Sequence, residues 1–203
     1  MRRTGNNELI LHRMESGDGG TLRLDSNGRS RYWELELTSR LLAGRHEMNF
    51  SYVRSRSQGD LNVFDAFFGN FRNPIVRPNQ FSVTETDTRH RFLFRGAFVV
   101  QKWTVSPVFE GRQGFPYSLV NKDRDFVGIR NLGGRFPHVR VLDLDVQRPL
   151  RIAGYDTWVG VRVYHLFENE FPRDVQANID APAFGRFTNY VEQSIGLTFR
   201  IDL

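Results

Sequence analysis

Residues 192–203 read EQSIGLTFRIDL, and from Ile195 onward every second side chain is apolar. Because successive side chains of a β-strand point to opposite faces of the sheet, this alternation assigns one set of residues to each face. The apolar set is Ile195, Leu197, Phe199, Ile201 and Leu203, and the polar set is Ser194, Thr198, Arg200 and Asp202. The stretch therefore predicts a strand with one apolar and one polar face.

The same alternation recurs along most of the chain. Six further runs show it, at 31–41, 46–56, 89–100, 103–112, 139–148 and 158–167. Two weaker runs, at 8–13 and 21–25, are joined by the turn-like segment Ser16-Gly17-Asp18-Gly19-Gly20. No convincing helix is predicted, so we expect an all-β fold of about nine strands.

Composition narrows the class of protein. The chain has 203 residues, of which 39% are hydrophobic and 13% aromatic, too many for a disordered chain. The longest apolar run, at 97–100, is far below the ~18 residues of a membrane helix, which excludes a helical membrane protein. The absence of Cys excludes disulfide scaffolds, Cys-type zinc sites and thiol catalysis. The net charge of +5 comes mainly from Arg residues dispersed along the chain, so we expect no nucleic-acid partner.

The connections between the runs alternate in length. Short links at 42–45, 101–102 and 149–156 alternate with long ones at 57–88, 113–138 and 168–190. In an antiparallel up-and-down sheet, alternate connections lie at the same end, so the short turns gather at one end and the long loops at the other. This arrangement, with strands of about ten residues, is typical of transmembrane β-barrels.

Alternation alone does not distinguish a membrane barrel from a soluble β protein, because both have one apolar and one polar face. Aromatic residues near strand ends, namely Trp33, Tyr52, Trp103 and Trp158, favour the membrane barrel because such barrels carry interfacial girdles. Two alternatives remain: a small self-contained outer-membrane barrel or porin, and a soluble β-sandwich binding module.

No pattern of catalytic or metal-binding residues is present. The five His are far apart, no G-x-S-x-G elbow or phosphate loop occurs, and 121–125 lacks the Gly and Glu of a calcium loop. Asp143 and Asp145 share one strand face, where we expect a polar wall with Arg partners, and His90 is expected to make a structural hydrogen bond. We therefore predict that the chain is not an enzyme and binds no metal or cofactor.

Candidate ligand-binding residues lie in the long loop 57–88, namely Asp60, Asn62, Phe64, Asp65, Asn70 and Arg72.

Several stretches resemble the late barrel strands of TonB-dependent outer-membrane receptors, most closely the type with an N-terminal carboxypeptidase-regulatory-like domain. They are GRSRYWELEL at 28–37, NFSYVRSRS at 49–57, DTRHRF at 87–92, EGRQGFPYS at 110–118, VYHLFENEFPRD at 163–174 and FTNY at 187–190. Two positions depart from the family pattern. Tyr164 or His165 stands where the family has Asn, and the final residue is Leu203 in place of an aromatic one.

The resemblance implies that the chain is the C-terminal part of a receptor barrel in the bacterial outer membrane. Such receptors take up a nutrient, for example a ferric siderophore or an oligosaccharide. Their partners are outer-membrane lipid, the barrel-assembly machinery, and a TonB energy-transducing complex that acts through the N-terminal region. The apolar alternation of the last strand, Ile195 to Leu203, would be the assembly signal. About nine strands is far short of the roughly 22 of a plugged transporter, so we expect the plug, the TonB box and the signal peptide outside this sequence.

Overall fold

The computed structural model describes residues 1–13, 22–60, 79–167 and 171–202. Its regular structure is entirely β-strand, which confirms the all-β prediction. No helix of the described residues is long and apolar enough to cross a membrane.

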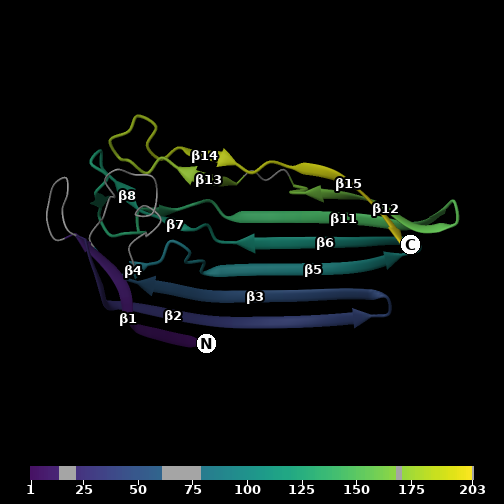
Figure 1. Cartoon of the computed structure of the whole chain (residues 1–203), viewed down its shortest axis with the longest axis horizontal. Coiled ribbons are helices and arrows are strands. Elements are labelled where there is room, and N and C mark those ends of the chain that lie inside the picture. The colour runs from purple at the N-terminus through teal and green to yellow at the C-terminus, as the bar shows by residue number, and fades with distance from the viewer. Residues whose placement is uncertain (14–21, 61–78, 168–170, 203) are drawn as a thin grey trace.

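Nine strands form one antiparallel sheet whose order follows the chain (Figure 1). The long strands are β1 (Arg2–Arg13), β2 (Leu22–Ala43), β3 (His46–Gly59), β5 (His90–Val100), β6 (Trp103–Arg112), β11 (Val139–Ile152), β12 (Tyr155–Tyr164) and β15 (Ser194–Asp202). The ninth strand, β4 (Ser82–Val83), pairs with the loop-side end of β3. The predicted up-and-down order is thus confirmed.

Short turns lie at one end of the sheet and long connections at the other, as predicted (Figure 1). Residues 44–45, 101–102 and 153–154 make the turns β2–β3, β5–β6 and β11–β12. In the last of these, Ala153 and Gly154 both have positive φ, 50° and 87°. Two successive positive φ values are the requirement of a type I′ hairpin turn, whose twist matches that of the flanking strands.

Two details of the strand prediction are wrong. The runs 21–25 and 31–41 belong to one strand, the 22-residue β2, which continues between them because β1 pairs with its backbone there. The pairing of β1 with β2 has two register shifts, each a β-bulge: between Asn6 and Glu8 the extra residue lies in β1, and between Glu8 and Ile10 it lies in β2. The predicted link 149–156 is also too long, because the positive φ values at 153–154 let β11 and β12 extend to the turn itself.

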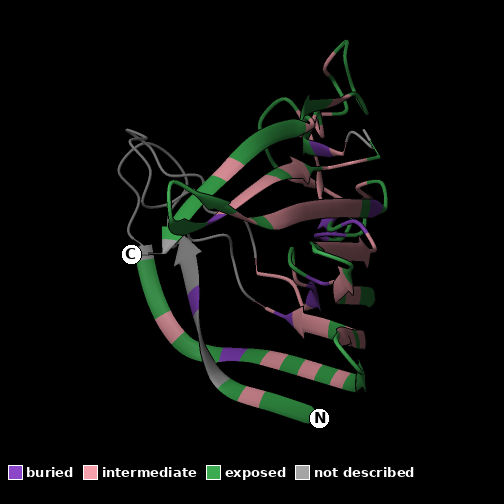
Figure 2. Ribbon diagram, turned by 90° about the vertical axis from the view of Figure 1, so that its right-hand side faces the viewer, coloured by how far each residue is buried: buried purple, intermediate pink, exposed green. Residues whose placement is uncertain are grey.

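The sheet is an open, curved arc when viewed along its strands (Figure 2). β1 and β15 are its two edges, and they do not pair with each other. One face, here called the outer face, carries the apolar residues of each strand, and the opposite or inner face carries the polar ones. Among the described residues only Ile10, Val83 and Val139 are buried hydrophobic side chains, so no core lies beneath either face.

The long connections fold into a loop layer at one end of the arc. It contains three two-stranded ribbons, which the sequence did not predict: β7 (Pro116–Tyr117) with β10 (Gly134–Arg135), β8 (Leu119–Val120) with β9 (Phe126–Val127), and β13 (Pro172–Val175) with β14 (Phe187–Tyr190). The rings of Tyr117, Phe136 and Phe187 meet at centroid distances of 5.5–6.3 Å and join two of these ribbons. Segments far apart in sequence therefore pack as one aromatic cluster.

Candidate functional site

The inner face holds the candidate site. One hollow there, of about 690 Å³, is lined by strand residues from β2, β3, β5 and β6, and all of them lie on the inner face of their strand. We call it the loop-side hollow, because Thr86, Asp87 and Thr88 border it as well.

The two walls of the loop-side hollow carry opposite charge. On β2, Glu34 accepts a hydrogen bond from the hydroxyl of Tyr32, and Glu36 accepts one from the Ser51 hydroxyl at 3.3 Å. Hydroxyl groups, and no cation, therefore bind these two carboxylates within the described part of the chain.

The facing wall, on β5 and β6, is basic. The Nε atoms of Arg91 and Arg112 lie 3.2 and 3.5 Å from the same Glu110 oxygen, and the Arg112 guanidinium lies 4.5 Å from the Phe115 ring centroid. Two arginines thus share one carboxylate, which leaves donor capacity for another acceptor. Because one wall is acidic and the other basic, the hollow suits a ligand group that is polar or zwitterionic better than one that carries charge of a single sign.

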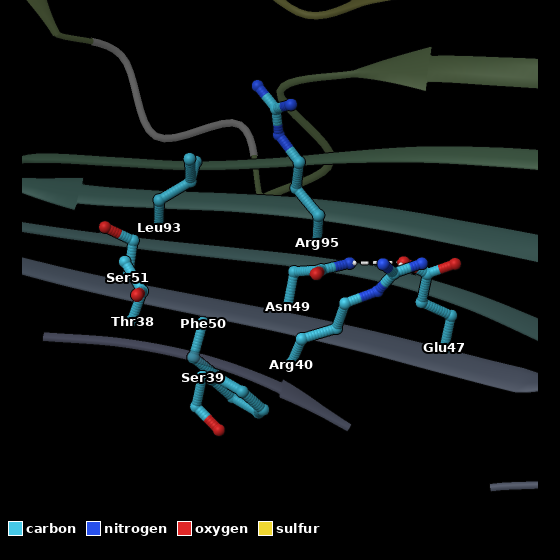
Figure 3. A pocket seen from close by; sticks show the side chains of 9 residues that line it. All are labelled: Thr38, Ser39, Arg40, Glu47, Asn49, Phe50, Ser51, Leu93 and Arg95. Atoms are coloured by element: carbon cyan, nitrogen blue, oxygen red, sulfur yellow. Dashed lines mark hydrogen bonds and ion pairs between the residues drawn. The ribbon is translucent and has the colours of Figure 1, made fainter. Parts of the chain in front are cut away.

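A second hollow, about 570 Å³, lies on the inner face nearer the short turns (Figure 3). Arg40 pairs with Glu47 at 2.9 Å, and the Asn49 amide donates to the same Glu47 oxygen at 3.0 Å. Arg95 extends upward from β5 in the view of Figure 3, whereas Phe50 and Ser39 point to the other side of the sheet. The close-up therefore displays both faces at once, with polar side chains inside and Phe50 outside.

The predicted polar wall at Asp143 and Asp145 is present, with one difference. Asp145 pairs with Arg162 on β12 at 2.6 Å, which confirms the expected arginine partner. Asp143 instead accepts a hydrogen bond from the backbone N–H of His165 at 2.9 Å. Both line a third inner hollow of about 390 Å³.

His90 makes the structural hydrogen bond expected of it, because its Nδ1 lies 2.8 Å from the Tyr52 hydroxyl. Both residues are on the outer face. The expected girdle position of Trp158 is wrong: it faces inward, because it lies four residues from Arg162 and therefore on the same face of β12. There it pairs with Arg200 across β12 and β15, with the guanidinium 5.1 Å from the ring centroid.

Of the predicted ligand-binding residues, only Asp60 lies in the described part of the chain. Its carboxylate accepts hydrogen bonds from the backbone N and the Nε of Arg29, at 2.9 and 3.3 Å, so it ties the end of β3 to β2. Asn62, Phe64, Asp65, Asn70 and Arg72 lie outside the described residues.

The sequence missed a buried polar cluster in the loop layer, here called the loop clip: Ser82, Asp87, Arg130, Asn131 and Arg135. Arg135 bonds the Asp87 carboxylate and also the Asp87 and Gly114 carbonyls at 2.8 and 3.0 Å, while Asp87 accepts the Ser57 N–H at 2.8 Å.

Arg130 and Asn131 complete the clip. Arg130 donates to the carbonyls of Gly59 and Gln80 at 2.5 and 3.1 Å, and burial lowers the pKa of its guanidinium. The Asn131 amide donates to the Val83 carbonyl at 2.9 Å. Because most acceptors are backbone carbonyls distant in sequence, no side-chain motif could have indicated these residues.

The apolar set of the last strand lies on the outer face as predicted. Ile195, Leu197, Phe199 and Ile201 are 66, 86, 61 and 46% exposed, and Leu203 lies outside the described residues. No group of His, Asp and Glu among the described residues is placed to hold a metal ion.

Comparisons with protein-family models, with curated proteins and with solved structures find no match to this chain.

Proposed function

We propose that this chain forms part of the wall of an outer-membrane β-barrel receptor of the TonB-dependent type, which takes up a nutrient such as a ferric siderophore or an oligosaccharide. The observation that carries the proposal is the exposed apolar outer face. Its exposed members extend from β2 to β15 and include Trp33, Leu35, Leu37, Phe50, Phe92, Val161, Leu197 and Phe199.

The outer face is continuous across neighbouring strands. The rings of Phe50 and Phe94 lie 4.9 Å apart, and those of Phe92 and Phe109 5.9 Å apart, so aromatic contacts cross β3, β5 and β6. On β12 and β15, Val161 stands opposite Leu197 and Val159 opposite Phe199. An apolar surface spanning a whole sheet far exceeds the few hundred Å² that soluble monomers expose. Lipid acyl chains would cover it.

The inner face would then line the lumen. Its ion pairs and hollows are the polar interior expected of such a barrel. The opposed charges of the loop-side hollow would hold a polar ligand or a plug segment by hydrogen bonds. In receptors of this type, the plug and an energy-transducing partner perform the transport step, and these strands would supply wall, lumen and loops.

The two open edges require further pairing under this proposal. Unpaired backbone groups of β1 and β15 would each cost several kcal/mol in a bilayer, where no water can satisfy them. We therefore propose that additional strands of the same polypeptide close the barrel, and that β15 carries the signal read by the assembly machinery.

The test is the mass and location of the native polypeptide. Membranes are fractionated and probed with an antibody against residues 57–88. A band in the outer membrane several-fold above 23.7 kDa would support the receptor. A membrane band at 23.7 kDa would favour a small self-contained barrel, and a detergent-independent soluble protein would favour a β-sandwich binding module and contradict the proposal.

A further inference from the structure

The charged residues of the outer face are distributed unevenly. Four exposed arginines of the outer set lie on the loop side of the apolar residues: Arg31, Arg54, Arg56 and Arg140, which we call the basic band. Across β2 and β3, Arg54 stands opposite Leu35 and Arg56 opposite Trp33, so the band directly borders the apolar residues.

One described carboxylate borders the band: Asp60, which pairs with Arg29 at 3.3 Å at the loop-side end of β2. On the strands of the large sheet from Arg31 onward, every Asp and Glu with a described side chain belongs to the inner set, for example Glu34, Glu110 and Asp145. Four described inner-face arginines have carboxylate partners, namely Arg40, Arg91, Arg112 and Arg162. No ion pair joins the basic band to a described carboxylate.

A shallow hollow of about 190 Å³ lies within the band. Tyr52, His90, His138 and Arg140 are among its lining residues, and Arg54 stands opposite His90 across β3 and β5. The hollow thus offers hydroxyl and imidazole groups beside two guanidinium groups, with no carboxylate in its lining. These are the donors that recognise phosphate.

The opposite boundary of the apolar face differs. Near the short turns, the outer set contains Arg148, whose guanidinium lies 5.4 Å from the Trp103 ring centroid, and His46, whose Nδ1 accepts the Val99 N–H at 3.2 Å. On the outer strand faces, the larger group of exposed arginines is therefore on the loop side, while Arg45 and Lys102 lie in the short turns themselves.

We propose that the basic band binds the phosphates of anionic lipid headgroups in the leaflet on the loop side of the sheet. The inference rests on the proposed membrane location and adds a headgroup preference to it. Acyl chains would contact the apolar face while their phosphates reach the arginines. Trp33 stands opposite Arg56 and Tyr52 lies two residues from Arg54, so both aromatic residues border the band, as interfacial aromatic residues do.

The test uses the full polypeptide, purified in detergent and given an equal mixture of phosphatidylglycerol and phosphatidylcholine. Bound lipid is counted by native mass spectrometry. The variant Arg54→Gln/Arg140→Gln removes two charges beside the outer hollow. The matched control Arg95→Gln/Arg151→Gln removes two exposed charges from the inner face.

The proposal predicts that the native protein and the control prefer phosphatidylglycerol, and that the band variant loses roughly 30-fold of this preference, about fivefold for each charge. Equal preference in the band variant and the control would overturn it. A band variant that instead loses binding to an acidic oligonucleotide, with lipid preference unchanged, would also overturn it.

A second measurement distinguishes failure of the proposed membrane location from failure of the proposed headgroup preference. Membrane fractionation of the same variants reports insertion independently of headgroup preference. An inserted protein without preference overturns the lipid inference alone, whereas a protein that never enters membranes overturns both.

Discussion

Leu197 lies mid-strand in β15 with 86% of its side chain exposed, and it tests the environment of the outer face. Leu197→Arg should lower the free energy of unfolding in lipid vesicles by about 2–4 kcal/mol if the residue contacts the bilayer midplane. In water, the same change at so exposed a position would stay within about 0.5 kcal/mol.

The control for Leu197 is Ser194→Arg, at an exposed position of the polar set on the same strand. Denaturant unfolding of both variants in vesicles measures the difference. Equal stability of the two would show that the outer face does not meet hydrocarbon.

Asp87 is expected to stabilise the folded loop layer. Its side chain is fully buried and is bound by Arg135 and by the Ser57 N–H, so Asp87→Ala removes the carboxylate acceptor of both, while two backbone carbonyls still bind Arg135. Breaking such a buried pair costs about 3–5 kcal/mol, and the lower end applies because Arg135 is partly exposed.

Limited proteolysis between residues 113 and 138, together with the free energy of unfolding, measures the effect of Asp87→Ala. Asp123→Ala removes an exposed carboxylate from the same layer and serves as the control. Matching proteolysis rates for the two variants would contradict a stabilising role for the loop clip.

At the scale of strands, two glycines on neighbouring strands differ in their surroundings. A Cβ added at Gly160 would lie 2.5 Å from the Val146 carbonyl oxygen, whereas one at Gly196 meets nothing within 4 Å. Gly160→Ala should therefore cost about 1–3 kcal/mol of stability through overpacking. Gly196→Ala should gain about 0.5–1 kcal/mol because alanine has less chain entropy to lose. Chemical denaturation distinguishes the signs, and a stabilising Gly160→Ala would disprove the close approach of β11 and β12.

A substitution in the β11–β12 turn is expected to stabilise the protein. Ala153 has a φ of 50°, a conformation that costs most side chains about 1–2 kcal/mol but that Asn adopts readily. Ala153→Asn should raise the free energy of unfolding by about 0.5–1 kcal/mol, and Ala153→Val should lower it. An equal response of the two variants would argue against the type I′ turn.

Strand positions could be predicted from the sequence because alternation is a local property of each strand. The boundaries at 26–30 and 149–152 could not, since pairing with β1 and the backbone of a tight turn determine them. The loop clip was equally inaccessible, because Ser82 reaches the Arg130 carbonyl, 48 residues away, through a contact that exists only after folding. By contrast, an arginine partner for Asp145 could be predicted from face assignment, which alternation supplies directly, although the structure was needed to identify it as Arg162.

At the scale of the whole molecule, the open edges make a prediction about dynamics. If residues 1–203 are refolded alone in micelles, backbone amides on the outer edges of β1 and β15 should exchange hydrogen fastest, and those of β5 and β6 slowest. Mass-resolved hydrogen exchange measures this gradient. Uniformly slow exchange at both edges would mean that they pair, as in a closed dimer, and would remove the need for additional strands.

The chain-order arrangement of the strands also bears on how such a protein can change over evolutionary time. Each long strand pairs only with the long strands nearest to it in the chain, so duplication or deletion of one whole hairpin leaves every remaining pairing intact. The turns stay at one end and the loops at the other as long as strands are gained or lost in twos. The width of the sheet can therefore evolve in hairpin steps, while loop length varies independently at the opposite end from the turns.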